Sequence, residues 1–231
     1  MLQANIKSII RVQAFVRRLI SRKAIKECIE QRDMYRMHAR YFTRDELFET
    51  LSTTKGLPRS GEAVHLQEKQ HIYKNGATYQ GQWFGNFRNG KGRMEWSDSA
   101  SYTGDWELGY ASGKGIFTDC LGNRYIGEFR LSMAHGKGTY TNTLGAIYEG
   151  EWRFDMQHGQ GTEKWLNSNS VFTGHFVDGL RNGHGVWIHK NKKYEGGWKN
   201  NMMDGEGTME WGYSQPPQKD QMLKGLSPSG Q

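Results

Sequence analysis

The chain has 231 residues, and its thirty glycines with only four prolines exclude a collagen-like protein. The formal net charge of +7 arises within residues 1–42, which carry ten Lys or Arg and three Asp or Glu. This local basicity argues against a nucleic-acid-binding surface spread over the whole chain. No apolar run approaches the about 18 residues of a membrane span, and no signal peptide is predicted. Cys28 and Cys120 lack the spacing of a disulfide framework or metal site, which indicates a reducing compartment.

Residues 3–40 predict a long basic helix, because they contain no Gly or Pro and their apolar residues recur at helical spacing. Within it, the stretch "VQAFVRRLISR" runs from Val12 to Arg22. Its order of aliphatic residue, Gln, Arg and Arg resembles the IQ motif, a family that binds calmodulin or related EF-hand light chains. The resemblance implies these calmodulin-binding residues: Ile9, Val12, Gln13, Val16, Arg17, Leu19, Ile20 and Arg22.

A basic amphipathic helix suits an acidic partner with an apolar groove, and Arg side chains pair well with carboxylates. Arg18 stands where the IQ family often has Gly, which implies a more extended partner. Two other interpretations remain open: the helix packs on its own chain or lies in solvent, or it lies on a membrane surface. Three acidic residues, Glu27, Glu30 and Asp33, weigh against the membrane surface.

A short second helix is expected through Leu51, because Thr43 and Glu46 have the spacing of a capping box. "STTKGLPRSGE" then reads as a linker. We expect four regions: a basic helical segment at 1–52, a linker at 53–68, a β-ribbon at 69–213 and a Pro- and Gly-containing tail at 214–231.

The rest of the chain is dominated by an internal repeat. An aromatic-x-Gly-x-aromatic pattern, followed seven residues later by Gly-x-Gly, occurs six times at steps of 23, 23, 23, 24 and 22 residues. The residues that define it are Tyr79, Gly81, Trp83, Tyr102, Gly104, Trp106, Tyr125, Gly127, Phe129, Tyr148, Gly150, Trp152, Phe172, Gly174, Phe176, Tyr194, Gly196 and Trp198.

Each copy predicts a β-hairpin. Side chains alternate along a strand, so the two aromatic residues and the glycine between them share one face. Turn-forming residues follow three positions after the second aromatic residue, at Asn86, Gly109, Ser132, Asp155, Gly179 and Asn201. The glycines, having no Cβ, let the rings of neighbouring strands lie close over the backbone. Since one hairpin is marginal in water, the copies must stack.

These residues closely resemble MORN repeats, whose pattern is Tyr-x-Gly-x-Trp followed by Gly-x-Gly. "YEGEW" at 148–152 matches it almost letter for letter. The resemblance implies a mainly β fold, a single-layer twisted ribbon of about six stacked hairpins. A half-repeat around His71 and Tyr73 precedes them, and the long and the short helix precede the ribbon.

No catalytic constellation stands out, and the chain is expected to be neither an enzyme nor a metal or cofactor protein. His135, His158 and His184 sit at turns, where other copies carry Asn, Ser or Asp. Glu149 and Glu151 share a strand face that we expect to be solvated rather than an acid/base pair.

The resemblances imply a non-catalytic scaffold, in which the ribbon docks a protein and the IQ helix carries calmodulin or a calmodulin-like light chain. MORN proteins of this kind occur in cilia, radial spokes and the cytoskeleton, so cytoskeletal or axonemal partners are expected in the cytoplasm or the ciliary axoneme. The alternative is phosphoinositide binding at membrane contacts, with Lys190, Lys192 and Lys193 as the best basic patch. The near-neutral ribbon makes lipid the weaker expectation, and no nucleic acid is expected.

Overall fold

The structure is a computed structural model, and it describes residues 41–43, 46–47, 49–50 and 66–214. The predicted long helix, the IQ residues, the linker up to residue 65 and the tail from residue 215 lie outside the described residues. Residues 66–214 form one open antiparallel sheet of 13 strands, in which every strand pairs with its neighbours in sequence. This confirms the mainly β, single-sheet prediction. Within the described part of the chain, no helix has the length and apolar character needed to cross a membrane.

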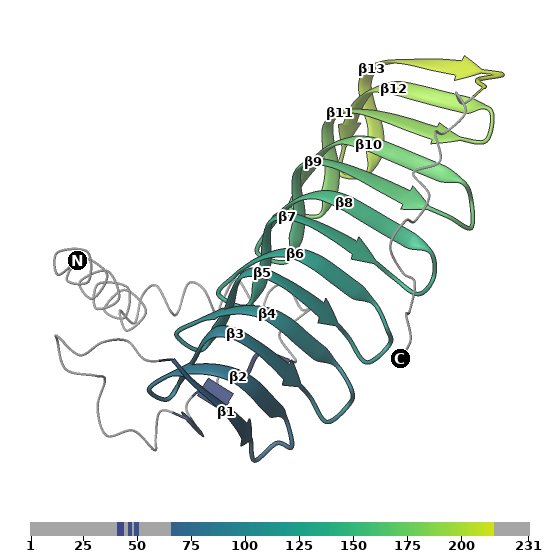
Figure 1. Cartoon of the computed structure of the whole chain (residues 1–231). Helices are drawn as coiled ribbons and strands as arrows, with labels where there is room; N and C mark the ends of the chain where they lie inside the picture. The colour runs from purple at the N-terminus through teal and green to yellow at the C-terminus, as the bar shows by residue number, and fades with distance from the viewer. Residues whose placement is uncertain (1–40, 44–45, 48, 51–65, 215–231) are drawn as a thin grey trace, which may run out of the picture.

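Figure 1 shows the strands stacked in order into an elongated, twisted ribbon, with β1 and β13 at opposite ends. The strands are β1 (Gln67–Ile72), β2 (Thr78–Phe84), β3 (Phe87–Glu95), β4 (Ser101–Glu107), β5 (Tyr110–Thr118), β6 (Arg124–Arg130), β7 (Met133–Thr141), β8 (Ala146–Arg153), β9 (Met156–Trp165), β10 (Ser170–Val177), β11 (Leu180–His189), β12 (Lys192–Lys199) and β13 (Met202–Trp211). The predicted half-repeat supplies β1, which begins at Gln67, two residues before the expected start of the ribbon.

Two-residue turns close the hairpins at the predicted positions. In five of the six hairpins, both turn residues have positive φ, as in Leu131 (53°) and Ser132 (66°). This is the conformation of a type I′ turn, whose twist matches that of paired strands. Non-glycine residues rarely adopt it, so leucine there indicates that the paired strands dictate the turn.

One face of the ribbon carries a continuous ladder of aromatic rings. All twelve aromatic residues of the repeat pattern are at most 7% exposed. Tyr148 shows the arrangement, because its ring lies edge-to-face at 5.1 Å from Trp152 in its own hairpin and at 5.1 Å from Phe176 in the next. Edge-to-face pairs add about 0.5–1.5 kcal/mol each beyond the burial of their area. The ladder therefore couples each repeat to its neighbour, and we call this surface the aromatic face.

The polar tips of these rings are satisfied by the backbone. The Tyr148 hydroxyl donates to the carbonyl of Glu151 at 2.9 Å, and Trp152 Nε1 donates to the carbonyl of Gly138 at 3.0 Å. Phe172 has no hydroxyl to donate, yet it is completely buried in the same position. The ring is thus the part of the side chain that the fold requires at this position.

The two glycines of each Gly-x-Gly have different structural tasks. The first always has positive φ, from 61° at Gly159 to 88° at Gly183, and it lies where the hairpin register shifts. There the Glu151 side chain accepts a hydrogen bond from the backbone N–H of Gln160 at 3.2 Å. The second glycine lies against the ring, since a Cβ on Gly161 would lie 2.6 Å from Tyr148 Cε2. Of these two glycines, the second meets the expectation of close ring packing, as does Gly150 between the two aromatic residues.

Successive repeats are also joined through their turns. Asp155 Oδ1 accepts a hydrogen bond from the N–H of Ala134 at 2.6 Å, and the Asp155 N–H donates to the Ala134 carbonyl at 3.0 Å. Ser132 makes the same reciprocal pair with Ala111 one repeat earlier. These residues were predicted only as turn formers, but they also fix the spacing of the stack.

Candidate binding surfaces

The segment formed by the described residues among 41–50 docks on the aromatic face of the first two repeats, and we call it the docked segment. Its two adjacent aromatic residues are each only 5% exposed. Phe42 packs edge-on against Trp96, with ring centroids 5.0 Å apart, and against Tyr102 at 5.6 Å. Tyr41 lies 5.2 Å from Phe117. Thus part of the aromatic face is already a docking surface within this chain.

A buried carboxylate anchors the same segment. Glu46 is 1% exposed, and its carboxylate accepts hydrogen bonds from Trp96 Nε1 at 2.9 Å and Asn75 Nδ2 at 3.1 Å. Its Oε2 lies 3.5 Å from Nη1 of Arg88, which is also buried. Burial raises the pKa of Glu46, while the Arg88 charge and these hydrogen bonds oppose that rise.

Arg88 is held in turn by the sheet. Its Nη2 donates to the carbonyl of Gly109 at 2.7 Å, and its guanidinium lies 4.4 Å from the centroid of the Trp106 ring. The centroid of the Tyr73 ring lies 5.6 Å from the same guanidinium. We call Arg88 with these aromatic neighbours the Arg88 site. In this chain it binds the Glu46 carboxylate, and its Trp106 ring packs against Phe42 at 6.1 Å.

The structure corrects the interpretation of Thr43 and Glu46 as a capping box. Residues 46–47 and 49–50 are helical, but Thr43 Oγ1 is buried without a hydrogen-bond partner. The Glu46 carboxylate points into the sheet instead of back to the start of the helix. The burial of Glu46 against Arg88 outweighs the local cap, because it satisfies a buried guanidinium.

The aromatic face is not covered equally along its length. One position shows this, the residue two places after the second glycine of each Gly-x-Gly. In the first two repeats its side chain is buried, since Met94 is 0% and Phe117 3% exposed. In the later repeats the same position is half-buried or exposed, as Tyr140, Trp187 and Met209 (39%) show. The described residues thus cover this position in the first two repeats and leave it partly open in the later ones, although the ladder rings beneath are buried throughout.

A second arginine lies on the later, partly open half of the aromatic face. Arg181 occupies the position of Arg88 four repeats further along, and its guanidinium lies 4.7 Å from the Trp165 ring and 5.5 Å from the Trp198 ring. Its Nη2 donates to Glu163 Oε2 at 3.1 Å, whereas its Nε is buried without a hydrogen-bond partner. Burial raises the pKa of Glu163, and Arg181 opposes that rise. We call Arg181 with Trp165, Trp198 and Glu163 the Arg181 site.

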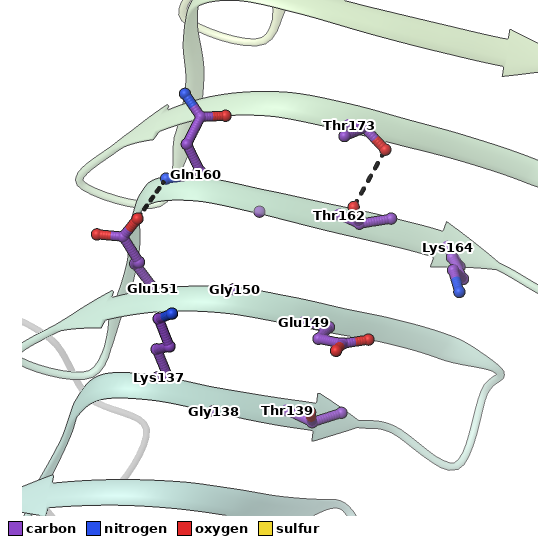
Figure 2. Close-up of a pocket in the computed structure, with 11 residues that line it drawn as sticks. Lys137, Gly138, Thr139, Glu149, Gly150, Glu151, Gln160, Thr162, Lys164 and Thr173 are labelled. Atoms are coloured by element: carbon purple, nitrogen blue, oxygen red, sulfur yellow. Dashed lines mark hydrogen bonds between the residues drawn. The ribbon is translucent and has the colours of Figure 1, made fainter.

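The opposite face carries a shallow hollow of about 640 Å³ over β7–β10. Figure 2 shows its floor at Gly138 and Gly150, where no side chains fill the surface, between polar side chains on either side. Lys137 and Lys164 balance Glu149 and Glu151. Glu151 is engaged with the backbone of Gln160. The hollow therefore follows from the glycine rows and presents no excess of either charge.

Reactive side chains are dispersed over the ribbon. In the part of the chain that the structure describes, no group of three His, Cys, Asp or Glu could hold a metal ion. His135 packs against the Phe154 ring at 5.2 Å, and burial and Arg130 lower its pKa. Of the proposed basic patch, Lys192 lies 4.5 Å from the Trp211 ring and Lys193 pairs with Glu195 at 2.7 Å.

The eight calmodulin-binding residues predicted between Ile9 and Arg22 lie outside the described residues. The eighteen repeat-defining residues form the ladder and its glycine rows. Sequence reasoning missed Glu46, Arg88 and Arg181 as binding residues. The available signal was an arginine in the first and fifth repeats where the other four carry Ala, Ala, Gln and Met.

The sequence matches the MORN-repeat family model at residues 79–101, 102–124, 125–143, 148–170, 172–192 and 194–212, which together exceed half of the chain. No curated protein sequence matches the chain. One similar solved structure is titled as the SAS-4 (dCPAP) TCP domain in complex with a proline-rich motif of Ana2 (dSTIL) of Drosophila melanogaster. It has 13% identity and a TM-score of 0.35, over 68% of this chain and 97% of that one. MORN repeats are typical of repeat proteins that bind membranes or other proteins. With six copies of the repeat stacked into one sheet, the chain belongs to the MORN-repeat family.

Proposed function

We propose that this chain is a non-catalytic scaffold whose ribbon docks a protein partner while its N-terminal IQ-like helix binds calmodulin or a calmodulin-like light chain. The observation that carries the ribbon's role is the docked segment, because the aromatic face already binds a peptide segment through two rings and a carboxylate. The same face continues over the later repeats, where no described residue outside the sheet covers its outer positions such as Met209.

The IQ-like motif supports the second part of the proposal. Gln13, Arg17 and Arg22 follow the spacing of a family that binds EF-hand proteins. The pairing of an IQ helix with MORN repeats fits an adaptor in an axonemal or other cytoskeletal assembly, and that setting is part of the proposal.

Phosphoinositide binding is the lower-ranked function. Anionic headgroups need a basic patch, and two of the three candidate lysines are engaged, Lys192 with a ring and Lys193 with a carboxylate. Liposomes containing phosphatidylinositol 4,5-bisphosphate test this directly. Co-sedimentation of the full chain that depends on the phosphoinositide would place lipid above protein as the ligand.

The test of the calmodulin part uses the full chain in a pull-down with calmodulin, with and without calcium. We expect calmodulin to be retained in at least one condition and to be lost in the double variant Gln13→Ala, Arg17→Ala. The matched control is Gln31→Ala, Arg32→Ala, which changes the same residue types outside the motif and should retain calmodulin. The IQ assignment is contradicted if both double variants retain calmodulin, or if the wild type retains it neither with nor without calcium.

A further inference from the structure

The strongest unassigned feature of the ribbon is the Arg181 site, because it repeats the Arg88 site on the partly open half of the aromatic face. The Arg88 guanidinium lies over the rings of Tyr73 and Trp106, and that of Arg181 lies over the rings of Trp165 and Trp198, with Phe172 also at 4.8 Å. In each case one ring comes from the end of the preceding repeat and the other from the outgoing strand of the following repeat. The two sites therefore present an arginine and two rings at equivalent positions, and the Arg181 site differs by its contact with Glu163 of the sheet.

The two sites differ in what covers them. At the Arg88 site, Glu46 reaches the guanidinium and the rings of Tyr41 and Phe42 cover the neighbouring aromatic surface. At the Arg181 site no described residue outside the sheet plays these parts. Phe117, which the docked segment covers, is 3% exposed, while Met209 at the corresponding position is 39% exposed.

Charge at the Arg181 site favours an acidic ligand. Among the described residues, Glu163 is the carboxylate that pairs with Arg181, and the Lys192 ammonium on the same face lies over the Trp211 ring. Glu163 reaches only Nη2 among the guanidinium nitrogens, and Nε has no hydrogen-bond partner. The Arg181 side chain is 17% exposed, and a partly exposed guanidinium with unused donors gains from a further acceptor.

We propose that the Arg181 site binds a short acidic helical segment of a protein partner, with two adjacent aromatic residues and a carboxylate four residues after the second. This deepens the proposed scaffold function and rests on it. The chemistry is copied from the docked segment, in which Phe42 and Glu46 have this spacing. The partner's rings pack beside Met209 and Trp187, and its carboxylate meets Arg181.

The test uses a fluorescein-labelled peptide with the sequence of residues 38–52, titrated with the full chain and followed by fluorescence anisotropy. We expect saturable binding to the wild type and about tenfold or more weaker binding to Arg181→Gln. Gln157 holds the equivalent position in the fourth repeat, so the fold tolerates glutamine there. Lys114→Glu is the matched control, because Glu206 holds its equivalent position, and it should bind like the wild type.

A second peptide, in which Glu46 is replaced by Gln, separates direct contact from a structural effect. It should bind the wild type about tenfold more weakly than the original peptide does. It should bind Arg181→Gln no more weakly than the original peptide does, because the Glu46 carboxylate of the peptide and Arg181 act as one pair. Equal binding of the original peptide to wild type and Arg181→Gln overturns the proposal, because the peptide is then exchanging with the docked segment. Absence of binding to the wild type also overturns it.

Two further readouts distinguish other occupants and the scaffold function itself. Sedimentation velocity of the full chain should show no self-association that depends on Arg181. If it does, a second copy occupies the site and the proposal of a separate partner is wrong. Arg181→Gln should still retain calmodulin in the pull-down, so a failed peptide titration with intact calmodulin binding rejects this site but leaves the calmodulin-binding part of the scaffold function standing.

Discussion

Glu46 Oε2 lies 3.5 Å from Arg88 Nη1, and the two side chains, 42 residues apart in sequence, are among the most buried charged groups of the described chain. The pair ties a short helical segment to a sheet that would otherwise present an open aromatic surface. A buried ion pair of this kind is costly to break from one side, because the remaining charge has no solvent to compensate it.

Glu46→Ala should therefore destabilise the docked segment, by about 3–5 kcal/mol if Arg88 stays buried. If the segment is released instead, the loss of stability is limited to the free energy with which the segment docks on the sheet. Either result should appear as faster amide hydrogen exchange at Leu47 and Thr50. Glu49→Gln is the control, since the His71–Glu49 pair is partly exposed and should contribute only about 0–1 kcal/mol. Equal exchange in both variants would show that the Arg88 pair does not hold the segment.

Gly150→Ala should destabilise the middle of the ribbon by about 1–3 kcal/mol or more. A Cβ at this position would lie 2.6 Å from the Gln160 carbonyl oxygen and 2.6 Å from Gly161 Cα, so backbone rather than a flexible side chain must move. Urea denaturation measures the loss. Glu149→Ala changes the adjacent residue on the opposite face and should have a small effect. A Gly150→Ala midpoint at the wild-type value would contradict the close approach of these strands.

His135 should make the ribbon less stable as the pH falls below its ordinary pKa of about 6.5. Burial, helped by Arg130, lowers the pKa of His135 in the folded chain, so the unfolded chain takes up the proton first. The contribution of neutral His135 to stability is therefore complete above its pKa in the unfolded chain. It declines as the pH falls towards its lower pKa in the folded chain.

His135→Asn tests this dependence by thermal unfolding between pH 5 and 8. Asn89 holds the equivalent position in the first repeat, where its side chain accepts a hydrogen bond from the Leu108 N–H at 3.1 Å, so asparagine suits the turn. The variant should lose less stability on acidification than the wild type. Parallel profiles for the two proteins would show that His135 does not titrate out of the folded state.

Much of the ribbon could be predicted because its information is local and repeated. Side-chain alternation placed Tyr148 and Trp152 on one face, and the short turn after Trp152 followed from residues that tolerate positive φ. Because the six copies follow one another at nearly constant spacing, the simplest arrangement is that the hairpins stack in sequence order. The separate roles of Gly159 and Gly161 were not predictable, because they depend on a register shift that appears only when two strands pair.

The binding surfaces depended on contacts between distant parts of the chain. In sequence, Glu46 lies three residues after Thr43 and suggests a local helix cap, whereas in the structure it binds Arg88. The repeat pattern marks Arg181 as an exception at its position, but only the structure shows that the rings of Trp165 and Trp198 lie around its guanidinium.

The sequence by itself determined the mainly β ribbon, its hairpin boundaries and its aromatic face, because each of these follows from residue type and spacing within about 23 residues. The tertiary structure decided which part of that face is covered and which is open. Burial of Glu46, Tyr41 and Phe42 depends on whether one surface finds a complementary one. That free energy is set by long-range packing and desolvation, which no local pattern encodes.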